Sequence, residues 1–330
     1  MRENGCVCAL YSCDTDNTYN MDVCYMEIIE YFISPVLALV TAPLLSGIIN
    51  KTKAFFAGRK GAPVLQLYYD LYRLFHKDSV ISGITSVIFK LAPVIVFGAT
   101  LAASSLLPFI SIGNGFYFTG DFVLLFYLLG LARFFLILCA LDTGSSFEGM
   151  GASREAFFSA LTEPIIFISI LTILKISHST SLIAAFASTG EKNWIIILLI
   201  ALPMFVVMLT ENARIPFDDP NTHLELTMVH EVMILDSSGV DLAFFEYAAS
   251  IKLWIFNLLF VKIIIPPCGV GVFSEILMIS MLMIITCIGI GVIESVMARS
   301  RLIKIPQLLY SAGIIACLGF FLSISNVIKW

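Results

Sequence analysis

The chain has 330 residues, of which 59% are hydrophobic and only 13% are charged, and its mean hydropathy is +0.95. Soluble domains carry about 25% charged residues because water covers their surface, so this composition excludes a soluble globular domain and indicates a protein embedded in lipid. The formal net charge of −5 argues against nucleic acid as a partner.

The first 25 residues differ from the rest, because they are polar and hold four closely spaced cysteines: Cys6, Cys8, Cys13 and Cys24. This spacing matches neither of the two common iron–sulfur runs. We therefore expect 1–25 to be a poorly ordered tail, with Met26 as the natural beginning, and leave a redox or metal site as the alternative. Residues 26–330 are expected to form one transmembrane helical domain.

Eight apolar runs follow, each about long enough to cross a bilayer. A single span must satisfy its own backbone hydrogen bonds, so each run predicts a helix. The sequence thus predicts an all-α membrane protein with about eight transmembrane helices. The runs are 28–50, 84–107, 121–142, 156–176, 194–212, 244–265, 274–297 and 307–325.

Segment 63–77 predicts a further, amphipathic helix lying in the membrane interface. Helical spacing places apolar side chains from Val64 to Leu74 on one face, and Asp70, Arg73 and Lys77 on the other.

The basic residues predict the orientation, because cytoplasmic loops carry an excess of Lys and Arg. One side has eleven: Lys51, Lys53, Arg59, Lys60, Arg73, Lys77, Arg154, Arg214, Arg299, Arg301 and Lys304. The other side has four: Arg2, Lys175, Lys192 and Lys329. The first side should be cytoplasmic, in a cytoplasmic (inner) membrane, with both termini outside.

Ionisable residues inside the runs are the main functional signal, since a charge at the bilayer centre costs about 3 kcal/mol on insertion scales. Structural ion pairs between helices would explain them, but we favour a hydrated polar track that receives protons or sodium. Five acids are expected near the cytoplasmic ends: Asp142, Glu163, Glu211, Glu246 and Glu294. Three bases are expected at mid-depth or nearby: Lys90, Arg133 and Lys252.

The loop 213–243 is long and acidic, and we expect it to be the main cytoplasmic docking surface. His223, Glu225, His230 and Glu231 are potential metal ligands, but their spacing differs from the His-Glu-x-x-His helix of zinc proteases. We expect no metal site here and interpret the loop as an entrance for protons.

Three segments carry a family resemblance: 211–231 (ENARIPFDDPNTHLELTMVHE), 58–70 (GRKGAPVLQLYYD) and 140–155 (ALDTGSSFEGMGASRE). In this order they resemble the signatures of the respiratory NADH dehydrogenase subunit 1 superfamily. The resemblance is closest to its hydrogenase branch, which includes formate hydrogenlyase subunit 4 and hydrogenase-4 component C, and it runs from about residue 28 to the C-terminus.

The resemblance implies a non-catalytic membrane subunit that couples a cytoplasmic redox arm to ion translocation. It implies cytoplasmic hydrogenase large and small subunits and antiporter-like membrane subunits as partners. Nickel–iron and iron–sulfur centres would lie in those partners, and no cofactor in this chain. The implied proton or ion funnel comprises Asp142, Glu148, Arg154, Glu163, Glu211, Arg214, Asp218, Asp219, Glu225 and Glu231, to which the intramembrane acid Glu246 is added. The implied docking face comprises Lys60, Asp70 and Arg73.

Two other functions stay open. The quinone-reducing branch carries a longer stretch, containing Pro-Asn-Arg, after the Arg-Lys-Gly of the motif, whereas here Gly61 runs directly into Ala62 and Pro63. This argues against the equivalent membrane subunit of an NADH (or other donor):quinone oxidoreductase. A stand-alone ion transporter would call for an internal repeat, and the two halves show none.

Overall fold

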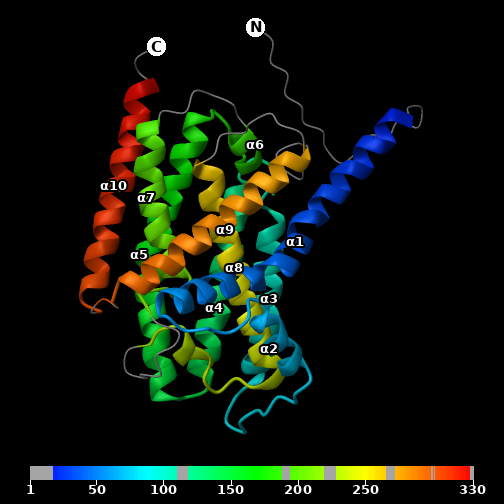
Figure 1. The fold of residues 1–330 in the computed structure, drawn as a ribbon, viewed down its shortest axis with the longest axis vertical. Helices are drawn as coiled ribbons and strands as arrows, with labels where there is room; N and C mark the ends of the chain where they lie inside the picture. The colour runs from blue at the N-terminus through cyan, green and yellow to red at the C-terminus, as the bar shows by residue number, and fades with distance from the viewer. Residues whose placement is uncertain are drawn as a thin grey trace.

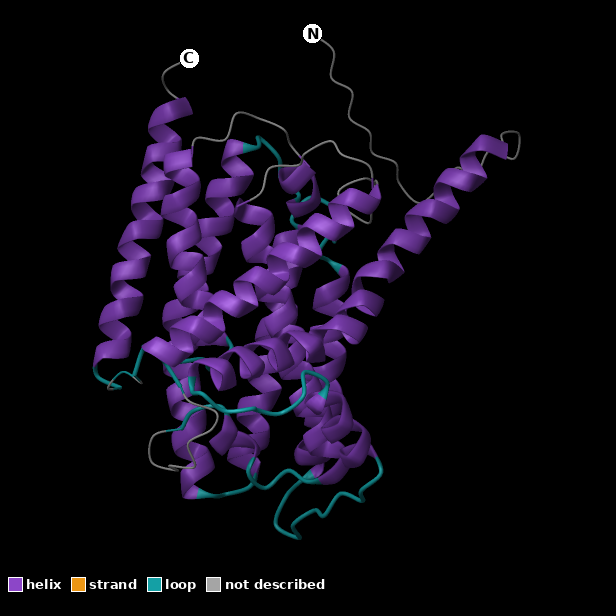
Figure 2. Cartoon of the chain, in the orientation of Figure 1, coloured by secondary structure: helices purple, strands orange, loops and turns teal. Residues whose placement is uncertain are grey.

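The structure is a computed structural model that describes residues 18–109, 118–187, 194–218, 228–264, 272–298, 300 and 302–327, with the backbone alone in 18–32, 187, 272 and 326–327. Within these ranges every regular element is a helix and none is a strand (Figure 2). Eight of the helices are long and apolar enough to cross a membrane. The predicted all-α membrane fold is confirmed.

Eight long helices form the bundle. They are α1 (Thr18–Phe56), α3 (Val87–Ser105), α4 (Asp121–Asp142), α5 (Ser146–Ile176), α7 (Trp194–Glu211), α8 (Gly239–Ile264), α9 (Val272–Val296) and α10 (Lys304–Val327). Three shorter elements are α2 (Gln66–Phe75), α6 (Leu182–Ala187) and the 3-10 turn η1 (Glu231–Ile234).

Helix α8 lies at the centre of the bundle. It is the most buried span and packs against α1, α3, α7 and α9, while α10 packs on α5 and α7 (Figure 1). Helices α1 and α9 are tilted relative to the more upright α5, α7 and α10. They approach closely, since a Cβ added at Gly291 of α9 would lie 2.7 Å from Thr52 Cβ of α1. Small residues permit such contacts between membrane helices.

Helices α1, α5 and α8 each begin at least five residues before the apolar runs predicted. Helix α5 starts at Ser146 rather than 156, and α8 starts at Gly239 rather than 244. The added segment of α5, nearly three turns long, is polar in sequence, yet its Glu148 and Ala152 are buried. A boundary predicted from hydropathy falls where charged residues begin. In the structure the helix continues past that point, because other parts of the protein cover its polar residues.

Helix α1 begins at Thr18, inside the segment 1–25 that was expected to be a tail. Residues 1–17, with Cys6, Cys8 and Cys13, lie outside the described residues. The tail and its alternative as a redox site stay predictions.

The predicted amphipathic helix is present as α2, packed against α8 and α1. Leu71 is buried, and Tyr69 and Tyr72 are exposed. Asp70, expected on the polar face, is half-buried and lines a cavity together with Leu67. Residues three apart on a helix are neighbours on its surface.

Candidate functional site

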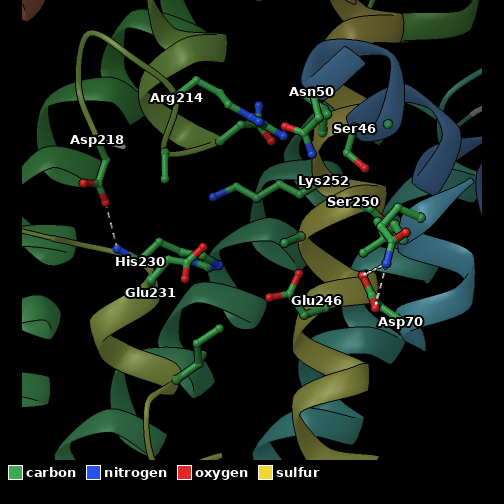
Figure 3. Close-up of a pocket in the computed structure, with 18 of the residues that line it drawn as sticks. Ser46, Asn50, Asp70, Arg214, Asp218, His230, Glu231, Glu246, Ser250 and Lys252 are labelled. Carbon is green, nitrogen blue, oxygen red and sulfur yellow. Dashed lines mark hydrogen bonds between the residues drawn. The ribbon is translucent and has the colours of Figure 1, made fainter. Parts of the chain in front are cut away.

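A cavity of about 260 Å³ lies where α1, α2, α8 and the end of α7 meet (Figure 3). Small and polar residues of α1 form one wall, and the other elements contribute apolar residues such as Leu67, Ile234 and Leu253 together with eight ionisable side chains. The ionisable side chains are Asp70, Glu211, Arg214, Asp218, His230, Glu231, Glu246 and Lys252. The ionisable part of this wall suits water and ions, because burying charges against an apolar ligand is costly.

The end of α7 brings Glu211 and Arg214 to this cavity. The helix is apolar up to its last residue, Glu211. Ala213 then adopts a left-handed φ of 49°. The Ala213 N–H donates to the Thr210 carbonyl at 3.1 Å, and the next N–H, that of Arg214, donates to the Leu209 carbonyl at 2.9 Å. This is a Schellman ending, which satisfies the last carbonyls of the helix and turns Arg214 into the site.

Behind the cavity, Arg133 of α4 is the centre of an ionic cluster. Its Nη2 lies 2.5 Å from Glu211 Oε2, and its Nη1 pairs with Glu163 of α5. Its Nε lies 3.7 Å from Glu155 Oε1, also on α5. Lys252 of α8 adds a second cation, 2.9 Å from Glu211 Oε2. Four helices therefore meet through one charged cluster.

Helix α5 presents its polar groups at intervals of seven residues. Glu148, Glu155 and Thr162 share the inward face, and Thr162 Oγ1 donates to Glu211 Oε1 at 2.5 Å. Glu163 is the residue after Thr162, so it points away from this inward face. Its side chain is 55% exposed, whereas that of Glu211 is 2% exposed. The cluster thus reaches from the interior to the outer face of α5.

A second cavity of about 40 Å³ adjoins the first and is lined by Arg133 and Glu155. His230, Ala249 and Lys252 line both cavities. A site needs about 10–15 Å³ of such volume to hold one water, so both cavities have room for water. The two cavities share these three lining residues and together extend from α2 to Arg133, with apolar side chains lining most of the smaller one.

His230 stands at the junction of the two cavities. Burial lowers the pKa of this imidazole to about 4; the positive charge of Lys252 adds to the effect, and the carboxylate of Asp218 opposes it. The ring is therefore neutral at pH 7. Asp218 also fixes the backbone here, because its Oδ2 accepts from the Val229 N–H at 2.8 Å and from the His230 N–H at 3.3 Å.

Two further predicted funnel acids lie away from the cavity and bind backbone groups. Asp142 Oδ2 accepts from the Ser86 N–H at 2.7 Å, at the start of α3. The buried Glu148 accepts from the Asp236 N–H at 3.1 Å. Their contacts tie the loops after α2 and η1 to the bundle. A role for them in ion transfer stays a prediction.

The other predicted residues fall into three places. Glu231 and Glu246 line the large cavity. Arg154 Nη1 donates to the Met228 carbonyl at 3.0 Å, which holds the chain before His230. Lys60 and Arg73, predicted to lie on the docking face, are exposed.

The loop 213–243 is only partly the open surface that the sequence predicted. Phe217, Asp218 and Val232 are buried, so the loop folds back against the bundle. Asp219, His223 and Glu225 lie outside the described residues. Within the part of the chain that is described, no group of three or more His, Cys, Asp or Glu side chains is placed to hold a metal ion.

Sequence reasoning missed Glu155 and the central position of Arg133. The seven-residue spacing from Glu148 to Thr162 would have indicated Glu155. It also missed that Glu294 pairs with Lys53 Nζ at 2.9 Å, which joins α9 to α1. No local pattern indicates that contact.

Comparisons with known proteins agree with the motifs. A sequence model of a family described as NADH dehydrogenase matches residues 29–324. Formate hydrogenlyase subunit 4 of Escherichia coli is 29% identical over 89% of this chain and 98% of its own length. Hydrogenase-4 component C of the same organism is 29% identical over 86% of this chain and 92% of its own length.

A more distant relative is a subunit of the NADH-quinone oxidoreductase of Chelativorans sp., 27% identical over 64% of this chain and 65% of its own length. Among solved structures, a chain of the archaeal membrane-bound sulfane sulfur reductase, a respiratory membrane complex, is similar in fold. Its TM-score is 0.78 at 18% identity, covering 90% of this chain and 99% of that one.

Proposed function

The chain belongs to the NADH dehydrogenase subunit 1 family, and from that premise we propose that it is the membrane-embedded coupling and anchor subunit of a complex-I-like membrane-bound nickel–iron hydrogenase. In this role it links a cytoplasmic redox arm to the translocation of protons or sodium. The chain is a multi-pass membrane protein, and its relatives are membrane subunits of hydrogenases or NADH:quinone oxidoreductases. Nearly full-length coverage of the two hydrogenase proteins supports the hydrogenase assignment.

The single observation that carries the coupling role is the position of Glu211. This carboxylate borders the large cavity and is held by Arg133 and Lys252. A hydrogen bond to a charged group contributes about 1.5–3 kcal/mol, and moving one charge against 100 mV costs about 2.3 kcal/mol. A change that makes or breaks one such contact is therefore large enough to drive one ion across the membrane.

The exposed Glu163 supports antiporter-like membrane subunits as partners. A carboxylate that is 55% exposed within a spanning helix would be costly against lipid, and a polar partner surface would cover it. On the cytoplasmic side, the exposed Lys60 and Arg73, with Asp70 between them and the cavity, suit the hydrogenase large and small subunits. Nickel–iron and iron–sulfur centres belong to those subunits in this proposal.

A second candidate is a partner arm that reduces quinone, favoured by the relation to the NADH-quinone oxidoreductase of Chelativorans sp.. The eight ionisable groups in the cavity wall support it less well, because an apolar quinone ring placed against them would displace their water.

Purification in mild detergent tests the assignment. We expect the chain to co-purify with soluble subunits that contain nickel and iron, and the reconstituted complex to evolve hydrogen while building an ion gradient. Activity that depends on quinone and is blocked by a quinone-site inhibitor would select the second candidate. A chain that moves ions as a monomer would contradict both.

A further inference from the structure

Arg133 lies directly between the inner and the outer carboxylate of the site. Its side chain is 9% exposed; it contacts Glu211 at the cavity through Nη2 and Glu163 at the outer face of α5 through Nη1. Any ion passing from the cavity to the outer face by the shortest route must pass this guanidinium.

A guanidinium is a poor relay. It stays protonated at every physiological pH, so it neither accepts a proton nor passes one on, and its positive charge repels sodium. While Arg133 bridges Glu211 and Glu163, it therefore blocks transfer between them. The block also needs no partner protein, because all three residues belong to this chain.

Two observations indicate that Arg133 has a second position. Among the described residues nothing accepts a hydrogen bond from its buried Nε, since Glu155 Oε1 is 3.7 Å away. Buried donors are rarely left without an acceptor. The cavity of about 40 Å³ lined by Arg133 and Glu155 provides space for a shift toward α5.

We propose that Arg133 is a gate that is closed while Glu211 is ionised and opens when Glu211 takes up a cation. This inference rests on the proposed function and adds the residue that prevents leakage. A neutralised Glu211 attracts Arg133 less, whereas Glu155 and Glu163 remain beside the guanidinium on α5 as its other partners. Lys252 remains beside Glu211 and pairs with its carboxylate when Glu211 is ionised again.

Passive leakage of the reconstituted whole complex tests the gate without any electron donor. Vesicles are given a pH gradient or a sodium gradient, and the decay of each is followed. We expect R133Q to dissipate at least one gradient about tenfold or more faster than the wild type, since loss of a charge-assisted hydrogen bond changes a barrier by that factor. K175Q, which removes a positive charge from the end of α5 where Lys175 lies over the Phe320 ring, should leave both decay rates unchanged.

Two more variants separate a gate from a purely structural role. R133K keeps the charge but cannot bridge two carboxylates, so its leak should fall between those of the wild type and R133Q. The R133K variant also tests the gate if the R133Q complex fails to assemble. In R133Q/E163Q the leak should return toward the wild-type rate, because the outer carboxylate is gone, whereas lost packing would leave the leak as fast or faster.

Gradients held equally well by R133K and the wild type would overturn the proposal, as would an undiminished leak in R133Q/E163Q. Neither result depends on hydrogen evolution or on the metal content of the partners. If the leak assay contradicts the gate, the proposed function is therefore unaffected and is tested separately by co-purification and hydrogen evolution.

Discussion

Buried and half-buried carboxylates in this chain divide into two groups by what their oxygens bind. Glu211 binds cations and a hydroxyl, and it borders a cavity. Asp142 and Glu148 accept backbone N–H groups at loop junctions. Asp218 belongs to both groups, because it lines the cavity and holds two N–H groups. In the sequence all four are acids near the ends of apolar runs, so the distinction could not be predicted.

His230 predicts a pH dependence of stability. Its folded pKa of about 4 lies below the ordinary value of about 6.5, so between these values the unfolded chain binds a proton that the folded chain does not. Stability should therefore fall as the pH drops from 6.5 to 4, by at most about 3 kcal/mol. Melting temperatures of the wild type and H230Q in detergent check this: H230Q should lose less over that interval, and parallel curves would contradict the assignment.

The backbone contacts of Asp218 predict that the substitutions D218N and D218A have different effects on local stability. D218N keeps an oxygen that accepts from the Val229 N–H, whereas D218A leaves that buried donor without an acceptor, at a cost of about 1–3 kcal/mol. Hydrogen exchange of the segment 228–234 should accelerate in D218A much more than in D218N. Equal acceleration in both variants would mean that the charge, rather than the backbone contact, matters.

At the scale of elements, the position of Glu155 follows from the period of α5 once its start is known. Glu148, Glu155 and Thr162 share one face because seven residues are nearly two helical turns. Hydropathy alone placed the start of this span at 156, which removed Glu148 and Glu155 from the predicted helix. The type and number of spans could be predicted, whereas helix starts inside charged protein surroundings could not.

The close packing of the loop after α1 against Gly47 predicts that the substitution G47A lowers the stability of the protein. A Cβ at this cavity-lining glycine would lie 1.9 Å from the Val64 carbonyl oxygen, so the segment 57–65 must move in G47A. We expect a loss of about 1–3 kcal/mol, measured as a lower melting temperature, and faster hydrogen exchange in 57–65. G98A is the matched control, because nothing lies within 4 Å of a Cβ there. Equal stability of the two variants would contradict the close packing of this loop.

For the whole molecule, eight spans and three ordered motifs could be recognised in the sequence, because each is a local pattern. The cluster of Arg133, Glu163, Glu211 and Lys252 could not be assembled from it, since the four residues come from four helices. The folded-back part of the loop 213–243 likewise depends on contacts with α4 and α5. Long-range packing decides both.

The orientation of the whole molecule gives another prediction. We propose that the side with eleven basic residues is cytoplasmic, so both termini face outward. Alkaline phosphatase fused after Trp330 should then be active, and a fluorescent protein inserted near Lys77 should be fluorescent. A fluorescent protein that is bright when fused after Trp330 would reverse the orientation.

The most direct test of the coupling role is the number of ions translocated per hydrogen molecule by the reconstituted complex. E211Q and E163Q should still evolve hydrogen but translocate far fewer ions, because each removes a carboxylate from the cluster around Arg133. E275Q, which removes a carboxylate of α9 that pairs with Lys262 at 3.3 Å, should translocate as the wild type does. Wild-type ratios in both E211Q and E163Q would contradict the account.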